Sequence, residues 1–178
     1  TASSREWLVD RRRQFHRYPE PGWCEFWTTD RIVSECEALG VDEVRYGPDV
    51  LAAGARDGVP DEATLTEWRE RARERGADPD RLQRMAGGFT GAIATVEGDR
   101  PGPTLALRVD IDALPQRESD GDDHAPASRG FSSDNEGYMH ACGHDAHMTF
   151  GLGVLREFVD GDFAGTLKVL FQPAEELI

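Results

Sequence analysis

The chain has 178 residues, enough to bury one sizeable core and within the usual size of a single domain. Asp and Glu number 34 against 20 Lys and Arg, which gives a formal net charge of −14 and argues against nucleic-acid binding through a basic face. No run of eighteen apolar residues occurs and charge follows soon after Thr1, so we expect neither a membrane span nor a secretion signal.

The first forty residues predict two helices. Ser3 and Glu6 have capping-box spacing, and the helix that they open should run to about Arg17, where a proline-containing turn ends it. A second helix is expected over residues 26–39, because its apolar residues repeat at helical spacing and Gly40 supplies a C-terminal stop.

Residues 57–88 are rich in Arg and Glu and poor in aliphatic residues, which predicts a helical insertion. Asp61 is expected to cap its first helix, and Asp78, followed by proline, to open a second that reaches the end of the insertion. Leu65 and Trp68 give the insertion one anchoring edge. We interpret its charges as a solvated face rather than a binding patch.

Apolar runs predict strands at residues 41–46, 91–96, 104–109 and 166–171, the last buried on both faces. Between them, a loop rich in Asp, Ser and Gly covers residues 118–136, and residues 144–159 read as a buried helix. This alternation of helices and strands implies an α/β layered sheet. The sequence contains no internal repeat, no phosphate-binding glycine loop and no Gly-x-Ser-x-Gly elbow.

The composition also bears on the protein's surroundings. The three cysteines lack the dense spacing of a disulfide scaffold, which favours a reducing, cytoplasmic compartment and a structural role for Cys24 and Cys36. Because Lys168 is the only lysine and acids are abundant, adaptation to high salt is a hypothesis. Equal stability of the fold with and without molar salt would contradict it.

Residues 140–147 hold three imidazoles, a thiol and a carboxylate. Thiolate and imidazole are good ligands for zinc and its neighbours, and Gly143 lets the backbone bring Cys142 and His144 to one point. Asp145 is a candidate to orient one of these ligands. The alternative is a helix N-terminus whose polar groups merely cap it.

Two pairs of acids follow predicted strands. Glu175 and Glu176 stand where α/β enzymes place their working groups, and one of them can bind metal while the other holds a proton. Asp110 and Asp112 alternate along a strand end and face the same side, so either can steady a metal-bound histidine. Taken singly, the two glutamates could be an ordinary surface pair, and the two aspartates could be helix-capping or turn residues. Together with the Cys142 stretch they describe one hydrolytic site.

Four segments, in chain order, resemble the M20 amidohydrolase family, in the branch that contains aminoacylases, hippurate hydrolases and auxin-conjugate hydrolases. They are RRQFHRYPE (12–20), LRVDIDALP (107–115), MHACGHD (139–145) and FQPAEE (171–176). The helical insertion resembles that of the p-aminobenzoyl-glutamate hydrolases, through stretches within residues 58–65, 71–73 and 87–91.

The resemblance implies a site that holds two divalent metal ions, zinc or manganese. Cys142 and His144 would bind the metal pair and Glu176 would be a further ligand. Glu175 would be the general base, which passes a proton from the attacking water to the leaving amine. The implied reaction is hydrolysis of the amide of an N-acyl amino acid, and p-aminobenzoyl-glutamate is the expected substrate. The alternatives are a general aminoacylase or hippurate-type hydrolase, and a truncated subunit without catalytic function.

The resemblance also implies a three-layer α/β/α mixed sheet of the zinc-peptidase type, of which residues 1–178 are the N-terminal part. The remaining metal ligands, the rest of the sheet and a dimerisation domain would lie beyond Ile178, and the full-length protein would form a homodimer or pair with a related subunit. Leu177 departs from the glycine usual in the family. Three ligands are too few to hold two cations firmly, so we expect weak or no metal occupancy in residues 1–178 alone. Two fully occupied ions bound only by these residues would contradict that.

Overall fold

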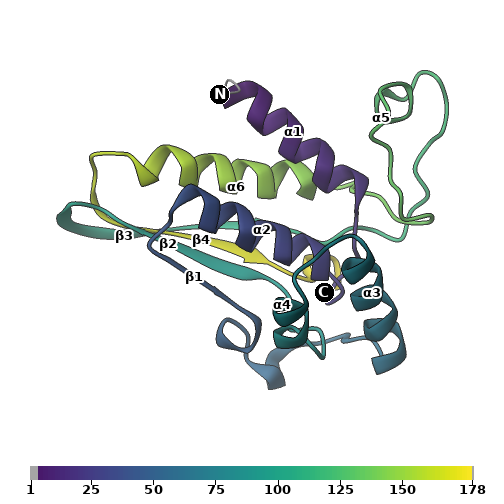
Figure 1. The fold of residues 1–178 in the computed structure, drawn as a ribbon, viewed down its shortest axis with the longest axis horizontal. Coiled ribbons are helices and arrows are strands. Elements are labelled where there is room, and N and C mark those ends of the chain that lie inside the picture. Colours follow the sequence, from purple (N-terminus) through teal and green to yellow (C-terminus); the bar gives the residue numbers. More distant parts are fainter. Residues whose placement is uncertain (1–3, 178) are drawn as a thin grey trace.

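The computed structural model describes residues 4–177, which form a four-stranded sheet with helices packed along one side (Figure 1). The helices are α1 (Ser4–Arg17), α2 (Phe26–Leu39), α3 (Glu62–Glu74), α4 (Pro79–Arg84), α5 (Ala125–Ser128) and α6 (His144–Val159). The strands are β1 (Glu43–Tyr46), β2 (Ala92–Glu97), β3 (Arg100–Asp110) and β4 (Ala164–Gln172), and a 3-10 turn, η3 (Glu175–Leu177), follows the last strand. No helix of the described part is long and apolar enough to cross a membrane.

The sheet is mixed, with strand order β1-β2-β4-β3. β2 runs antiparallel to β1 and to β4, whereas β3 and β4 are parallel and are joined through α6. Although β2 and β3 follow each other in the chain, β4 lies between them. This crossover makes β3 and β4 end at the same edge of the sheet, where α6 begins.

The core lies between the sheet and the helices α2 and α6. Leu167, Val169 and Phe171 alternate along β4 and are buried toward the helices. α6 approaches the sheet closely at Gly151, where a Cβ atom would lie 3.1 Å from the Phe171 ring. On the outer side, α1 crosses α6, and a Cβ at Gly153 would lie 2.9 Å from the Leu8 side chain. Glycines therefore let three layers of backbone approach one another.

The mixed α/β sheet that the sequence predicts is confirmed, and α3 and α4 are the two helices expected within residues 57–88. Leu65 and Trp68 are buried, as the anchoring edge requires, and Cys24 and Cys36 are fully buried free thiols. That residues 57–88 are an insertion stays a prediction. Ser3, expected to cap α1, lies outside the described residues.

Three expectations differ from the structure. β4 is buried on one face only, because the residues between Leu167, Val169 and Phe171 face a side that is half exposed. The second helical layer of a three-layer arrangement is thus not among residues 4–177. α4 ends at Arg84, earlier than expected, and the chain continues in turns to Gly88. The loop at 118–136 contains a short helix, α5.

Glu20 connects α2 to the segment that follows β3. Its carboxylate accepts hydrogen bonds from the backbone N–H groups of Trp27 and Thr28, at 3.1 and 2.8 Å, and so caps the first turn of α2. Its backbone carbonyl accepts a hydrogen bond from the N–H of Ala113, at 2.9 Å. The side chain is completely buried, and burial raises the pKa of Glu20 to about 7 despite these bonds.

We predict a pH-dependent cost at Glu20. Since the pKa rises from 4.5 to about 7 on folding, the folded state holds a proton that the unfolded chain has lost, and stability decreases as pH rises through this window. Relative to Glu20→Gln, the wild-type free energy of unfolding should fall by on the order of 3 kcal/mol between about pH 4.5 and pH 7. Urea unfolding at a series of pH values measures the difference.

The matched control is Glu74→Gln, because Glu74 is exposed on α3. Its stability should follow that of the wild type across the same pH range. A constant gap between wild type and Glu20→Gln would show that Glu20 does not gain a proton on folding.

Candidate metal centre and catalytic residues

Three segments that carry acids, histidines or a thiol meet at the edge where β3 and β4 end. Asp110 ends β3 and Asp112 follows it, residues 142–147 lead into the first turn of α6, and residues 175–176 follow β4 in the turn η3. Because α6 runs back against both strands, its N-terminus lies at their carboxyl ends. The parallel crossover therefore brings together segments that are far apart in the sequence.

His144 has a defined orientation at this edge. Its Nδ1 lies 2.8 Å from the backbone oxygen of Asp112, and since a carbonyl only accepts, Nδ1 carries the hydrogen and a neutral ring keeps the lone pair on Nε2. Nε2 faces the two glutamates, 3.7 Å from Glu176 Oε1 and 3.9 Å from Glu175 Oε2. Burial alone would lower the pKa of His144, but the hydrogen bond to Asp112 and the charge of Asp110 raise it on balance.

Cys142, His144 and Glu176 offer one ligand atom each within 4.8 Å of one another. Cys142 is exposed, and its hydrogen bond to Glu176, with burial and the nearby acids adding to it, raises the pKa of the thiol to about 11. A thiol, an imidazole nitrogen and a carboxylate thus converge where negative charge accumulates. This donor set fits a zinc-like divalent cation, which would stabilise the thiolate that its neighbours disfavour.

Asp112 contacts both segments of this cluster, the one that carries His144 and the one that carries Glu176. It is 1% exposed, and its Oδ2 accepts a hydrogen bond from the backbone N–H of Glu176, at 2.9 Å. Its Oδ1 lies 3.3 Å from His144 Nδ1 and, within the described structure, has no hydrogen-bond partner. One buried aspartate therefore fixes both His144 and the turn that carries Glu176. That Asp112 orients a metal ligand stays a prediction.

Asp110 contacts a residue that the sequence analysis did not single out. Its Oδ1 lies 2.5 Å from Nδ1 of His147 and 3.4 Å from Nε2 of His144, and its Oδ2 accepts a hydrogen bond from Arg108 at 2.6 Å. Burial opposes ionisation, but the His147 bond and the His144 charge hold the pKa of Asp110 below its usual value. The signal for His147 was its spacing, because positions three apart on a helix share a face.

Asp145 points away from the candidate ligands. Its Oδ2 lies 2.8 Å from His16 Nδ1 and 2.7 Å from Arg12 Nε, both on α1, and its Oδ1 accepts a hydrogen bond from the N–H of Ala146. We expected Asp145 to orient Cys142 or His144, whereas in the structure its contacts join α6 to α1. Adjacent residues at a helix start point in different directions, which explains the difference.

Glu25 is a second residue that the sequence analysis missed. It is fully buried beneath the turn η3, where its carboxylate accepts hydrogen bonds from Thr90 Oγ1 at 2.6 Å and from the N–H of Ala174 at 2.8 Å. Burial, and then the charge of Asp112, raise the pKa of Glu25 well above its usual value. Ala174 has a φ of 54°, so Glu25 helps to hold the strained residue that precedes Glu175. A lone acid between aromatic residues was the available signal.

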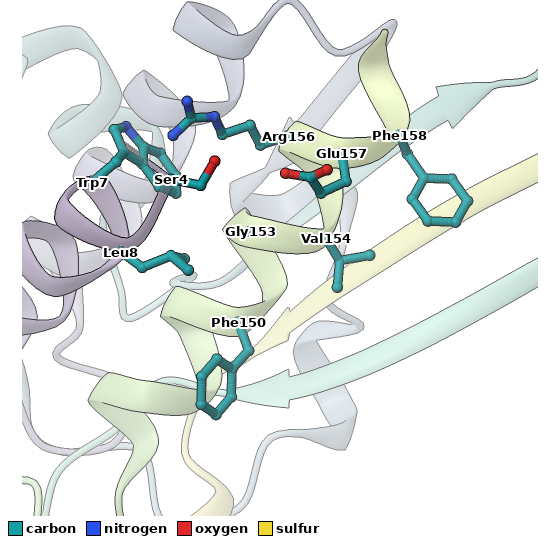
Figure 2. A pocket seen from close by; sticks show the side chains of 9 residues that line it. All are labelled: Ser4, Trp7, Leu8, Phe150, Gly153, Val154, Arg156, Glu157 and Phe158. Atoms are coloured by element: carbon teal, nitrogen blue, oxygen red, sulfur yellow. The ribbon is translucent and has the colours of Figure 1, made fainter. Parts of the chain in front are cut away.

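A groove between α1 and α6 offers a contrast to this edge. Figure 2 shows that its walls are formed mainly by apolar side chains, among them Trp7, Leu8, Phe150 and Val154. Phe150 is 61% exposed. The groove lacks the convergent acids and imidazoles of the sheet edge, so chemistry is assigned to the edge.

The comparisons with known proteins agree with this assignment. The model of peptidase family M20/M25/M40 matches residues 106–178. The chain is 47% identical to indole-3-acetyl-aspartic acid hydrolase of Enterobacter agglomerans and 46% identical to one of the subunits of p-aminobenzoyl-glutamate hydrolase of Escherichia coli K12, in each case over 93% of the chain. It spans only 38% of the length of each of these relatives.

Solved structures show the same fold. An aminobenzoyl-glutamate utilization protein from Klebsiella pneumoniae matches with a TM-score of 0.73 and 37% identity, over 96% of this chain and 37% of that one. A dinuclear-metal-binding peptidase of the M20 family from Bacillus subtilis matches with a TM-score of 0.65 and 28% identity, over 97% of this chain and 36% of that one.

Asp112 provides a test of the cluster geometry. In the full-length protein, Asp112→Ala should free the N–H of Glu176 and remove the carboxylate that lies 3.3 Å from His144 Nδ1, while the backbone oxygen that accepts from His144 stays in place. We expect binding of divalent metal to weaken by about 10- to 100-fold. Competition with a chromogenic chelator measures the affinity. Asp122→Ala, on an exposed loop position, should bind like the wild type. Unchanged affinity in Asp112→Ala would separate Asp112 from the metal centre.

Proposed function

Because residues 106–178 match the model of peptidase family M20/M25/M40, we propose that this chain is the N-terminal part of a metal-dependent amidohydrolase. The observation that carries the proposal is the convergence of Cys142, His144 and Glu176 within 4.8 Å, next to Glu175 in the same turn. These residues come from two segments some thirty positions apart. Asp112 contacts both, because its backbone oxygen accepts from His144 and its carboxylate accepts from the N–H of Glu176.

The proposed roles follow from the positions of the side chains. Cys142, His144 and Glu176 would hold divalent cations, for which zinc and manganese are the candidates, together with ligands from the remainder of the protein. When bound, the cations would polarise the scissile carbonyl and make the attacking water more acidic. Asp112 keeps His144 turned with Nε2 toward the glutamates, and Asp110 holds His147 beside it.

Glu175 is the candidate general base. Its carboxylate is partly exposed, 28% at the side chain, so it can reach water, and it does not belong to the ligand cluster of Cys142. Glu175 would take a proton as the water oxygen attacks the amide carbon. As the carbon–nitrogen bond breaks, it would give this proton to the leaving amine. The carboxylate returns to its starting state in each cycle.

The proposed substrate is an aromatic acyl group joined through an amide to an acidic amino acid. Two relatives support this class, since their names give indole-3-acetyl-aspartic acid and p-aminobenzoyl-glutamate as substrates. We take p-aminobenzoyl-glutamate as the first choice. A general aminoacylase or hippurate-type activity is the second, and a panel that includes an N-acetyl amino acid and hippurate distinguishes them.

Association with another chain is a further part of the proposal. The Escherichia coli relative is named as one of the subunits of its hydrolase, which supports a dimer of identical or related chains in the full-length protein. A non-catalytic subunit is the competing function. The effect of changing Glu175 distinguishes the two, because only an active site depends on its base.

We predict that Glu175→Gln in the full-length protein lowers kcat for p-aminobenzoyl-glutamate by about 10²- to 10⁴-fold, because the amide cannot accept the proton. Release of p-aminobenzoate, followed with zinc or manganese added, measures the rate. KM should change less than kcat.

Glu157→Gln is the matched control, since Glu157 is exposed on α6. It should retain wild-type turnover. If Glu175→Gln were equally active, Glu175 would not be the base. If the wild type released no amine from any member of the panel, the non-catalytic function would be favoured.

A further inference from the structure

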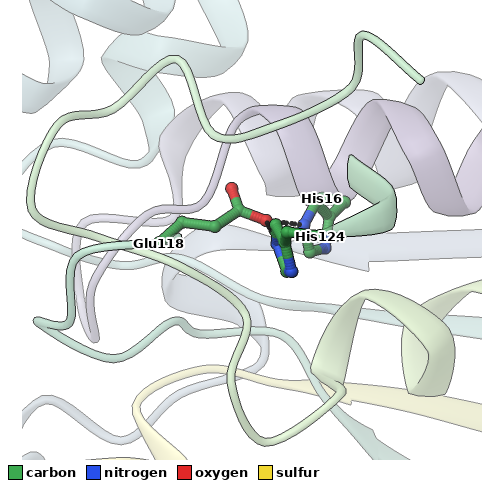
Figure 3. Close-up of side chains that lie close together, drawn as sticks. All are labelled: His16, Glu118 and His124. Carbon is green, nitrogen blue, oxygen red and sulfur yellow. Dashed lines mark hydrogen bonds and ion pairs between the residues drawn. The ribbon is translucent and has the colours of Figure 1, made fainter. Parts of the chain in front are cut away.

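A second cluster of possible metal ligands joins α1 to the loop that spans residues 116–138. His16 and His124 approach the same oxygen of Glu118, each with Nε2 2.7 Å from Oε1 (Figure 3). The three ligand atoms lie within 4.8 Å of one another. None of these residues belongs to the Cys142 cluster, and the proposed hydrolysis uses none of them.

The Nδ1 atom of His16, which does not face Glu118, fixes the orientation of the ring. Nδ1 lies 2.8 Å from Asp145 Oδ2, which also forms an ion pair with Arg12 Nε at 2.7 Å. Since the carboxylate is ionised by its pairing with Arg12, Nδ1 carries the hydrogen and a neutral ring leaves Nε2 as a free ligand. A carboxylate behind a histidine is the usual support of a metal-bound imidazole.

Both carboxylate oxygens of Glu118 have defined partners, so its orientation is fixed as that of His16 is. Its Oε1 faces the two histidines, while its Oε2 accepts a hydrogen bond from the backbone N–H of Ser133 at 2.6 Å. The side chains of Glu118 and His16 are 5% and 4% exposed, and that of His124 is 28% exposed. Two ligands are therefore fixed in a desolvated position, and the third leaves one side of the cluster accessible to an ion and to water.

We propose that His16, Glu118 and His124 form a second divalent-cation site, with zinc as its ion. Two imidazole nitrogens and one carboxylate oxygen are a common zinc ligand set, and water would complete a tetrahedron. Zinc–ligand bonds of about 2.0–2.1 Å place the ligands about 3.3 Å apart. Each of the two nitrogen–oxygen distances of 2.7 Å would lengthen by about half an ångström, which the flexible side chain of Glu118 permits.

The site would act as a clamp on the loop. An antiparallel bridge between Leu114 and Met139 closes the base of this loop, and His140 and Cys142 follow directly. Glu118 and His124 lie on the loop, whereas His16 lies on α1. An ion shared by the three would therefore hold the loop against α1, beside the first turn of α6.

The alternative is a hydrogen-bond cluster without metal. A doubly protonated His16 would donate one N–H to Asp145 and the other to Glu118, and balance their charges with the help of Arg12. The same contacts would then need no ion. Zinc must displace the proton on Nε2, so only a direct measurement of bound metal separates the two.

The test is the zinc content of the full-length protein, measured by elemental analysis after gel filtration. The wild type should hold one more zinc ion per chain than His124→Gln, while Glu136→Gln, an exposed acid on the same loop, should match the wild type. Glu118→Gln should also lose one ion, which keeps the test valid if His124→Gln fails to fold. Equal zinc content in wild type and both site variants overturns the proposal.

Tryptic cleavage provides a second measurement, because Arg117 and Arg129 are exposed on the loop. Zinc should slow cleavage after these residues by about tenfold or more in the wild type and in Glu136→Gln, since bound ion stabilises the closed loop. In His124→Gln, whose Cys142 cluster is intact, zinc should give no protection. Equal protection in His124→Gln would assign the effect to the Cys142 cluster and overturn the clamp.

Discussion

The parallel pairing of β3 with β4 determines where the candidate metal centre lies. Two parallel strands joined through a helix end at one edge of the sheet, and the helix starts there. Asp110 and Asp112, Cys142 and His144, and the two glutamates occupy these ends. A shift of register by one residue in β3 would turn Asp110 to the opposite face and separate it from His147.

Acidic side chains are concentrated at the edge of the sheet where β3 and β4 end. Asp112 and the two glutamates of η3 lie around His144. Burial, and then the charge of Asp112, raise the pKa of Glu25, and the hydrogen bond to Glu176 is the main cause of the raised pKa of Cys142. Carboxylates kept this close destabilise the fold unless protons or cations are shared among them. The same arrangement makes the edge suited to divalent ions, which would offset this charge.

Local signals in the sequence predicted most of the secondary structure, because helical spacing, capping residues and apolar runs act over a few positions. The positions of strand ends and helix starts also predicted one site for the Cys142 stretch and the glutamate pair, whereas only the resemblance to the M20 family selected Glu176 as the ligand. Local signals did not predict the insertion of β4 between β2 and β3, or the exposure of one face of β4. Both depend on which distant segments pair or cover the sheet, and no short window of sequence contains that information.

The same limit explains Asp145, the residue whose contacts differ most from expectation. Its partner His16 lies 129 positions away, and nothing near Asp145 in the sequence indicates α1. His144 is anchored to Asp112 on the sheet side, and Asp145 is anchored to His16 and Arg12 on the α1 side. The first turn of α6 is therefore held from both sides. Whatever fixes His16, whether a proton shared with Glu118 or an ion, also limits the movement of His144 at the candidate metal centre.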